Sequence, residues 1–86
     1  MRRIGNHVRF EGEVIGTIDK IASVPQNLGA HGTREWRIER IQRTDGSESL
    51  LRICYYKDGK WANRPPTLHR DVFVKLLDEA KKQGII

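Results

Sequence analysis

Residues 35–56 read EWRIERIQRTDGSESLLRICYY, which is two strand-like stretches on either side of a turn. In the first stretch, Trp36 and Ile38 alternate with charged residues, as expected of a strand with one buried face. Asp45-Gly46 is a strong signal for the turn of a β-hairpin. This segment therefore predicts two neighbouring antiparallel strands.

The second stretch has the same alternation. One face carries Leu51, Ile53 and Tyr55, and the other carries Arg52, Cys54 and Tyr56. In the first stretch Ile41 is out of phase with Trp36 and Ile38, which predicts a β-bulge near Glu39-Arg40. Such a bulge leaves open the face to which Arg40 belongs.

Working outward, residues 7–19 also alternate between apolar and polar side chains. Gly12 and Gly16 predict a bend or bulge, so this segment forms one long curved strand or two short ones. Residues 25–32 are rich in turn-forming residues and predict a loop. The pattern leaves open whether residues 1–33 join the main sheet or form a separate hairpin.

On the C-terminal side, a second turn at Asp58-Gly59 precedes a possible short strand over residues 60–64. Pro65-Pro66 places that strand at a sheet edge, because proline cannot donate to the ladder. Residues 70–83 predict a helix, with Thr67 or His69 at its N-cap and Gly84 as its stop.

The chain is therefore expected to be one α+β domain over residues 1–86. It would have a strongly bent antiparallel sheet of about four strands within residues 7–64, followed by a single C-terminal α-helix. Its 86 residues, 37% hydrophobic, suffice for one small core.

Composition excludes several classes of protein. No apolar run approaches the ~20 residues of a membrane helix, and the N-terminus lacks the apolar segment of a signal peptide. A single cysteine, Cys54, excludes an internal disulfide and suits a reducing compartment. We expect a cytoplasmic protein, associated with the nucleoid if the source is bacterial.

The net charge of +5 is concentrated in the middle of the chain. Residues 34–64 hold eight Lys or Arg against five Asp or Glu, together with four of the six aromatic residues. Cations that contact phosphates, interleaved with rings that stack on bases, are typical of single-stranded nucleic-acid binding. The alternative is an ordinary sheet with a solvated basic face.

Two groups of residues are the candidates for this activity. Phosphate contacts are predicted for Arg37, Arg40, Arg43, Arg52, Lys57, Lys60 and Arg64. Base stacking is predicted for Tyr56 and Trp61, because Tyr56 shares a face with Arg52 and Trp61 lies between Lys60 and Arg64. Trp36 and Tyr55 are in phase with apolar neighbours, so a core position is expected for both.

The helix predicts a dimer. Its apolar arc spans about half of the circumference, which is more than docking on one sheet requires. A second copy of the chain would cover the excess, with Phe73, Val74 and Leu77 as the expected interface. The alternative is that Val74 is simply one exposed apolar residue.

From Trp36 onward the chain resembles the single-stranded-DNA-binding coactivator family typified by positive cofactor four. The stretch over residues 51–56, the turn at Asp58-Gly59, and the helix start at Thr67-Leu68 and Phe73 carry the resemblance. It implies a dimer with paired helices and a concave sheet that holds single-stranded DNA. The chain departs from the family pattern at Arg52, at Cys54 and over residues 61–66.

Catalysis and cofactors are not predicted. His7, His31 and His69 show no ligand spacing, and one cysteine cannot form a Cys/His zinc pattern. Glu11 and Glu13 would share a strand face, but paired surface carboxylates are common. We therefore expect no enzyme, no metal and no cofactor. The predicted function is non-sequence-specific binding of single-stranded DNA or RNA in transcription, replication or repair; the alternative is a protein-interaction module that uses the exposed sheet face or edge.

Overall fold

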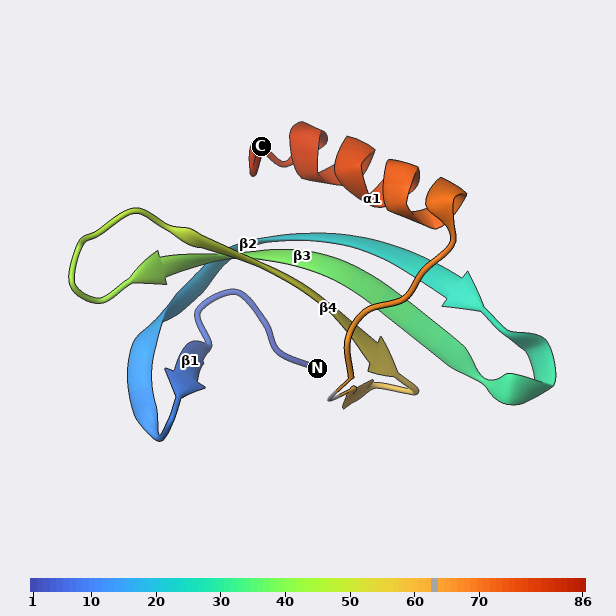
Figure 1. Cartoon of the computed structure of the whole chain (residues 1–86), viewed down its shortest axis with the longest axis horizontal. Coiled ribbons are helices and arrows are strands. Elements are labelled where there is room, and N and C mark those ends of the chain that lie inside the picture. Colours follow the sequence, from blue (N-terminus) through green and yellow to red (C-terminus); the bar gives the residue numbers. More distant parts are fainter. Residues whose placement is uncertain (63) are drawn as a thin grey trace.

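The computed structural model describes residues 1–62 and 64–86 and has the expected α+β arrangement. Five strands form one antiparallel sheet, and a single helix follows them (Figure 1). The elements are β1 (His7–Phe10), β2 (Glu13–Asn27), the short 3-10 helix η1 (Gly29–His31), β3 (Thr33–Arg43), β4 (Leu50–Lys57), β5 (Lys60–Trp61) and α1 (Arg70–Lys82).

The N-terminal segment belongs to the main sheet, which the sequence had left open. The strand order is β1-β2-β3-β4-β5, so each strand pairs with its neighbour in the chain. Residues 7–19 form two strands, separated by a turn in which Glu11 and Gly12 both have positive φ, 51° and 83°. The sheet therefore has five strands where about four were expected.

The turn at Asp45-Gly46 sets the register of β3 against β4. Counting outward equally from these two residues pairs Ile38 with Ile53 and Trp36 with Tyr55, as the structure has them. Gly46 has φ +75°, a conformation that favours glycine. The hairpin signal in the sequence therefore fixes which side chains of β3 and β4 are neighbours.

The bulge predicted near Glu39-Arg40 is wrong. The pairing of β3 with β4 is unbroken from Arg34 to Ile41, and the irregularity lies in β2, between Ile18 and Lys20. Ile41 is out of phase because it belongs to a different core. It packs with Val8 and Ile18 on the face opposite to Ile38.

The sheet has two faces with different contents. The helix face carries α1, which packs Leu76 and Ala80 against Ala22, Trp36 and Ile38. Figure 1 shows α1 above β2, β3 and β4, while β1 and the N-terminal segment curl beneath the sheet. We call that second side the inner face.

The helix ends close to its predicted boundaries. His69 is the N-cap, although its side chain makes no capping hydrogen bond, and α1 ends at Lys82. Gly84 has φ +73°, and the N–H of Ile85 donates to the carbonyl of Ala80 at 2.9 Å, closing the last turn. Fully buried Leu76 contributes about 2 kcal/mol through its removal from water.

The expected final strand over residues 60–64 is shorter than predicted. β5 comprises only Lys60 and Trp61, which pair with Lys57 and Tyr56. The N–H of Ala62 also donates to the carbonyl of Tyr55 at 3.1 Å. Asn63 lies outside the described residues.

Candidate nucleic-acid interface

Arg37 is directed into the inner face and is almost completely buried. Its Nε donates to Glu35 Oε2 at 2.6 Å, and its Nη1 donates to Glu39 Oε2 at 3.2 Å and to the carbonyl oxygen of Arg2 at 2.6 Å. Although burial opposes a charged guanidinium, the two carboxylates raise the pKa of Arg37. This cation is committed to the interior of the protein.

Arg52 bonds to the same Glu39 carboxylate as Arg37. Its Nε and Nη2 donate to Glu39 Oε1 at 2.9 and 2.7 Å, and the hydroxyl of Tyr56 lies 3.4 Å from Glu39 Oε2. Tyr56 is only 2% exposed, and the guanidinium of Arg37 lies 4.6 Å from the centre of its ring. Arg37, Arg52 and Tyr56 thus surround one buried Glu39, and Tyr56 is not presented to a ligand.

The other two β3 arginines that were predicted to contact phosphate, Arg40 and Arg43, also have acidic partners. Arg40 lies on the helix face, opposite Leu51, and forms a two-pronged ion pair with Asp19 at 2.9 and 2.8 Å. The hydrogen bond from Arg40 lowers the pKa of Asp19. Arg43 lies 3.5 Å from Asp45. The centre of the sheet is therefore close to charge balance.

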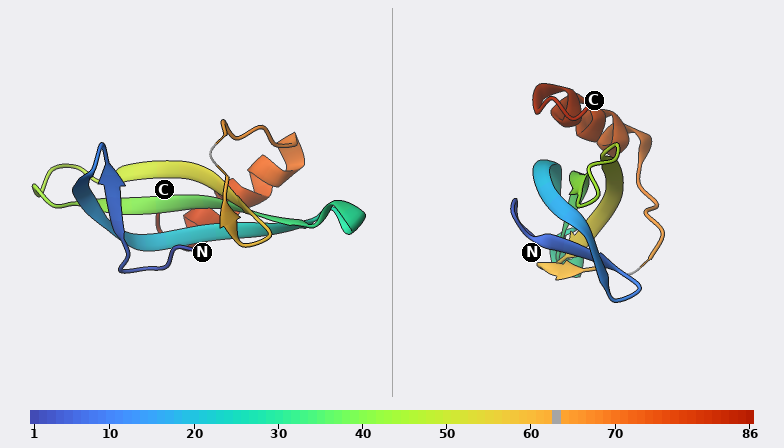
Figure 2. Two further views of the ribbon diagram at one scale, coloured as in Figure 1. Left: turned by 90° about the horizontal axis from the view of Figure 1, so that it is seen from below. Right: turned by 90° about the vertical axis from the view of Figure 1, so that its left-hand side faces the viewer.

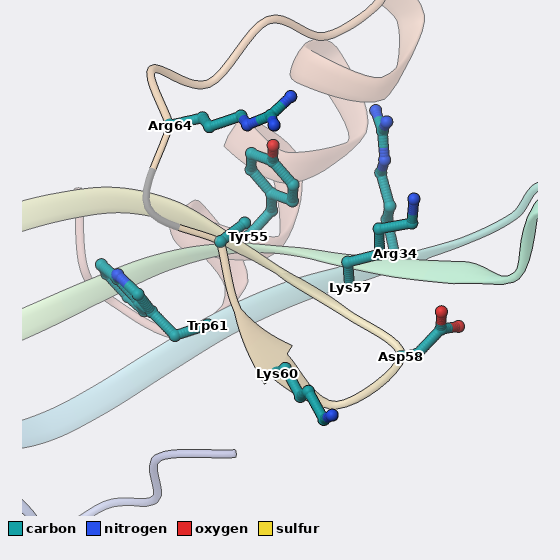
Figure 3. Close-up of a pocket in the computed structure, with 8 residues that line it drawn as sticks. Arg34, Tyr55, Lys57, Asp58, Lys60, Trp61 and Arg64 are labelled. Atoms are coloured by element: carbon teal, nitrogen blue, oxygen red, sulfur yellow. The ribbon is translucent and has the colours of Figure 1, made fainter.

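Basic side chains gather instead at the turn between β4 and β5, around an open pocket of about 570 Å³. The pocket is lined by Arg34, Tyr55, Lys57, Asp58, Lys60, Trp61, Ala62 and Arg64. In Figure 3, Arg34 and Lys57 stand side by side, Arg64 and the Tyr55 hydroxyl lie across from them, and Lys60 points the other way. The described lining of the pocket therefore includes four cations and one carboxylate.

The carboxylate of Asp58 is hydrogen-bonded to the backbone. Its Oδ1 accepts a hydrogen bond from the N–H of Thr33 at 2.9 Å, which ties the start of β3 to the β4–β5 turn. Asp58 itself has φ +50°, a conformation that Asp and Asn tolerate better than most residues. The acidic group is therefore explained by the turn and leaves the pocket with an excess of positive charge.

Arg34 is the residue that the sequence analysis missed. Its Nε is buried and has no hydrogen-bond partner among the described residues. Its guanidinium lies 5.4 Å from the centre of the Tyr55 ring, facing the pocket beside Lys57. The signal was available, because counting outward from Asp45-Gly46 places Arg34 opposite Lys57.

The aromatic residues divide between core and surface. Trp36 and Tyr55 are buried in the helix-face core, with ring centres 4.7 Å apart, as predicted. Trp61 is 38% exposed at the rim of the pocket, edge-on to Tyr56. The guanidinium groups of Arg2 and Arg52 lie 4.6 and 4.8 Å from the centre of the Trp61 ring. Of the two rings predicted to stack, Trp61 is the accessible one.

The remaining candidates are placed as follows. Phe73 and Val74 are exposed on α1, whereas Leu77 is partly buried against the core. Within residues 1–62 and 64–86, no group of three or more His, Cys, Asp or Glu side chains is arranged to hold a metal ion. In the same part of the chain, no helix is both long and apolar enough to cross a membrane.

Comparison with known proteins adds no relative: no family model matches the sequence, and no curated protein or solved structure matches it significantly.

Proposed function

We propose that this domain binds single-stranded nucleic acid at the β4–β5 pocket, with phosphates held by its cations and a base stacked on Trp61. One observation carries the proposal: Arg34, Lys57, Lys60 and Arg64 line an open pocket, and the one carboxylate among its described lining residues already accepts a hydrogen bond from the N–H of Thr33. Arg34 supports it further, because it lines the pocket beside Lys57 and forms no ion pair with any of the described residues.

The site is smaller than the sheet-wide groove that the sequence suggested. Arg37, Arg40 and Arg52 are held by carboxylates, so their contribution to phosphate binding is already offset. Lys57, Lys60 and Arg64 stay in the proposed site, and Arg34 joins them. A base that stacks on Trp61 takes the place of the Arg2 guanidinium. The requirement for an unstacked base favours single strands over duplexes.

The resemblance to the positive cofactor four-like family is consistent with this activity. We accordingly propose a role in transcription, replication or repair, in the cytoplasm or at a bacterial nucleoid. The mechanism is non-covalent, and it needs neither a metal nor a cofactor.

Fluorescence anisotropy of labelled single-stranded DNA, single-stranded RNA and duplex DNA at several salt concentrations tests the proposal. Four phosphate contacts predict a log–log slope of affinity against salt of about −3 on single strands. We expect single strands to bind more tightly than the duplex. Comparison of the affinities for single-stranded DNA and single-stranded RNA shows which of the two is preferred. Binding that ignores strandedness, or that is absent at low salt, would overturn the proposal.

The alternative, a protein-interaction module, is favoured by one separate observation. The outer edge of β4 carries the exposed apolar side chains of Leu51 and Ile53, away from the basic pocket.

A further inference from the structure

The outer edge of β4 is largely open. β5 pairs only with Tyr56 and Lys57, and Ala62 reaches Tyr55. Among residues 1–62 and 64–86, no backbone group bonds to the outer edge of residues 50–54. Figure 2 shows the three long strands side by side, with β4, in yellow, at one side of them and β2 at the other. Such an edge presents unpaired N–H and C=O groups that can pair with another strand.

The same part of β4 is apolar on the helix face. Leu51 and Ile53 are 49% and 43% exposed, because α1 packs mainly over β2 and β3 and leaves this part of β4 uncovered. Leu51 and Ile53 lie beside Arg40 and Ile38 in the register. Protected edge strands usually carry charged side chains or are covered by another element, whereas this edge exposes large aliphatic side chains. The edge is therefore suited to pairing with another strand.

The neighbouring flank of α1 extends the apolar surface. Lys75 and Lys82 line a pocket with residues of β2, so that flank of the helix faces the β2 side. Phe73 and Leu77 lie on the other flank at 100° per residue, toward β4, and Phe73 is exposed. Val74 points away from the sheet and does not belong to this surface.

We propose that a second copy of the chain covers this surface, with the two β4 edges paired antiparallel about a two-fold axis at Arg52. In that register Leu51 of one copy lies opposite Ile53 of the other, so apolar side chains meet on the helix face. The sheet then runs continuously through both copies. A two-fold axis makes the same edge serve both partners, which is the commonest symmetry of dimers.

The position of the two-fold axis follows from which backbone groups of β4 are unpaired on either side of Arg52. An axis at Ile53 would need the backbone of Tyr55, which Ala62 already uses, and an axis at Leu51 would need Ser49, outside the strand. The axis at Arg52 brings two arginines together, but each is already bonded to the buried carboxylate of its own Glu39. The like charges that would oppose pairing are therefore offset within each copy.

Sedimentation velocity across a range of protein concentrations, without nucleic acid, is the first test. We expect a concentration-dependent dimer, strengthened by moderate salt because each copy carries +5 and salt screens the repulsion. This salt dependence is opposite in sign to that of the proposed nucleic-acid binding, so the two proposals can fail separately. A monomer at every concentration and salt would overturn the dimer.

Charge placed on the edge provides the matched comparison. Leu51→Lys with Ile53→Lys should abolish the dimer, whereas Ile4→Lys with Phe10→Lys adds the same charge at exposed apolar sites elsewhere and should preserve it. Circular dichroism verifies that both double variants are folded. A dimer that survives the β4 substitutions would place the interface elsewhere and overturn the proposal.

Disulfide trapping tests the register without disrupting the surface. In a Cys54→Ala background, an equimolar mixture of Leu51→Cys and Ile53→Cys should form a mixed disulfide, because directly opposite Cα atoms lie within bridging distance. Leu51→Cys alone should cross-link much more slowly, since its two cysteines would lie diagonally across the axis. Equal rates for the mixture and the single variant would overturn the register.

Discussion

Arg52 donates two hydrogen bonds to one carboxylate oxygen of Glu39, which is completely buried. Arg37 and Tyr56 contact the other oxygen of the same carboxylate. The sequence predicted that Arg52 belongs to a basic binding face. In the structure its side chain is instead the partner of the buried Glu39 carboxylate. The inner face gains a rigid polar cluster, and the protein loses that cation for binding phosphate.

Substitution of Glu39 should be strongly destabilising. Glu39→Gln removes the charge that compensates two guanidinium groups, and breaking a buried pair from one side costs about 3 kcal/mol. Glu13→Gln, at an exposed position of β2, removes the same charge and should change stability by less than about 0.5 kcal/mol. Urea denaturation followed by circular dichroism measures both variants. Equal stability of the two would contradict the assigned role of Glu39.

The sequence accounts for this cluster only in part. Equal counting from Asp45-Gly46 pairs Glu39 with Arg52 as it pairs Trp36 with Tyr55, so the β3–β4 contacts are predictable from the turn. The ion pair between Asp19 and Arg40 is not, because residues 28–32 between β2 and β3 carry no two-residue turn signal from which the register of these strands could be counted.

The contacts of the N-terminal segment could not be predicted from the sequence either, because they join residues that are far apart in the chain. Arg2 reaches the ring of Trp61 and the guanidinium of Arg37 only because the sheet curls. Gly12 and Gly16 predict a bend, but not which distant residues the bend brings together. Strand existence, the helix and the Trp36–Tyr55 core were predictable from alternation and phase. Which arginines remain free to bind depends on long-range pairing, and so the expected groove shrinks to one end of the sheet.

Removal of a pocket cation should weaken nucleic-acid binding in a salt-dependent way. For Lys60→Ala and Arg64→Ala separately, we expect the log–log salt slope on single strands to become shallower by about 0.7. Lys81→Ala removes an equal charge from the last turn of α1, away from the pocket, and serves as the control. Anisotropy titrations measure all three. A slope change in Lys81→Ala as large as in Lys60→Ala would indicate general electrostatic attraction instead of a site.

Neutralising Asp58 should have the opposite effect. Asn keeps a side-chain oxygen for the N–H of Thr33 and tolerates the positive φ of this position, so Asp58→Asn should retain the turn. Loss of the negative charge leaves four cations unopposed by any lining carboxylate, and affinity for single strands should rise. Thermal unfolding verifies the fold, and the same anisotropy assay gives the affinity. Unchanged or weaker binding by a folded Asp58→Asn would count against the pocket as the phosphate site.

The stacking role of Trp61 can be separated from that of Trp36. The chain has two tryptophans, so Trp36→Phe leaves Trp61 as the only indole reporter. We expect its emission to be quenched by single-stranded DNA, and the complementary Trp61→Phe variant to show almost no quenching from buried Trp36. Trp61→Ala should weaken binding by about 1–3 kcal/mol. Full affinity in Trp61→Ala would exclude base stacking on this ring.

Cys54 should make the protein less stable in alkali. Burial, and then the nearby negative charge of Glu39, raise the pKa of the Cys54 thiol to about 12. The folded state therefore keeps the proton that the unfolded chain loses near pH 8.5. Because the folded pKa is the higher one, the stabilisation is complete below the unfolded pKa and is lost as pH rises toward 12. Urea midpoints between about pH 7 and about pH 10 should fall more steeply for the wild-type chain than for Cys54→Ala. The burial of Cys54 also predicts slow labelling of the native protein by thiol reagents. Parallel pH profiles together with rapid labelling of the native protein would place this thiol outside the core.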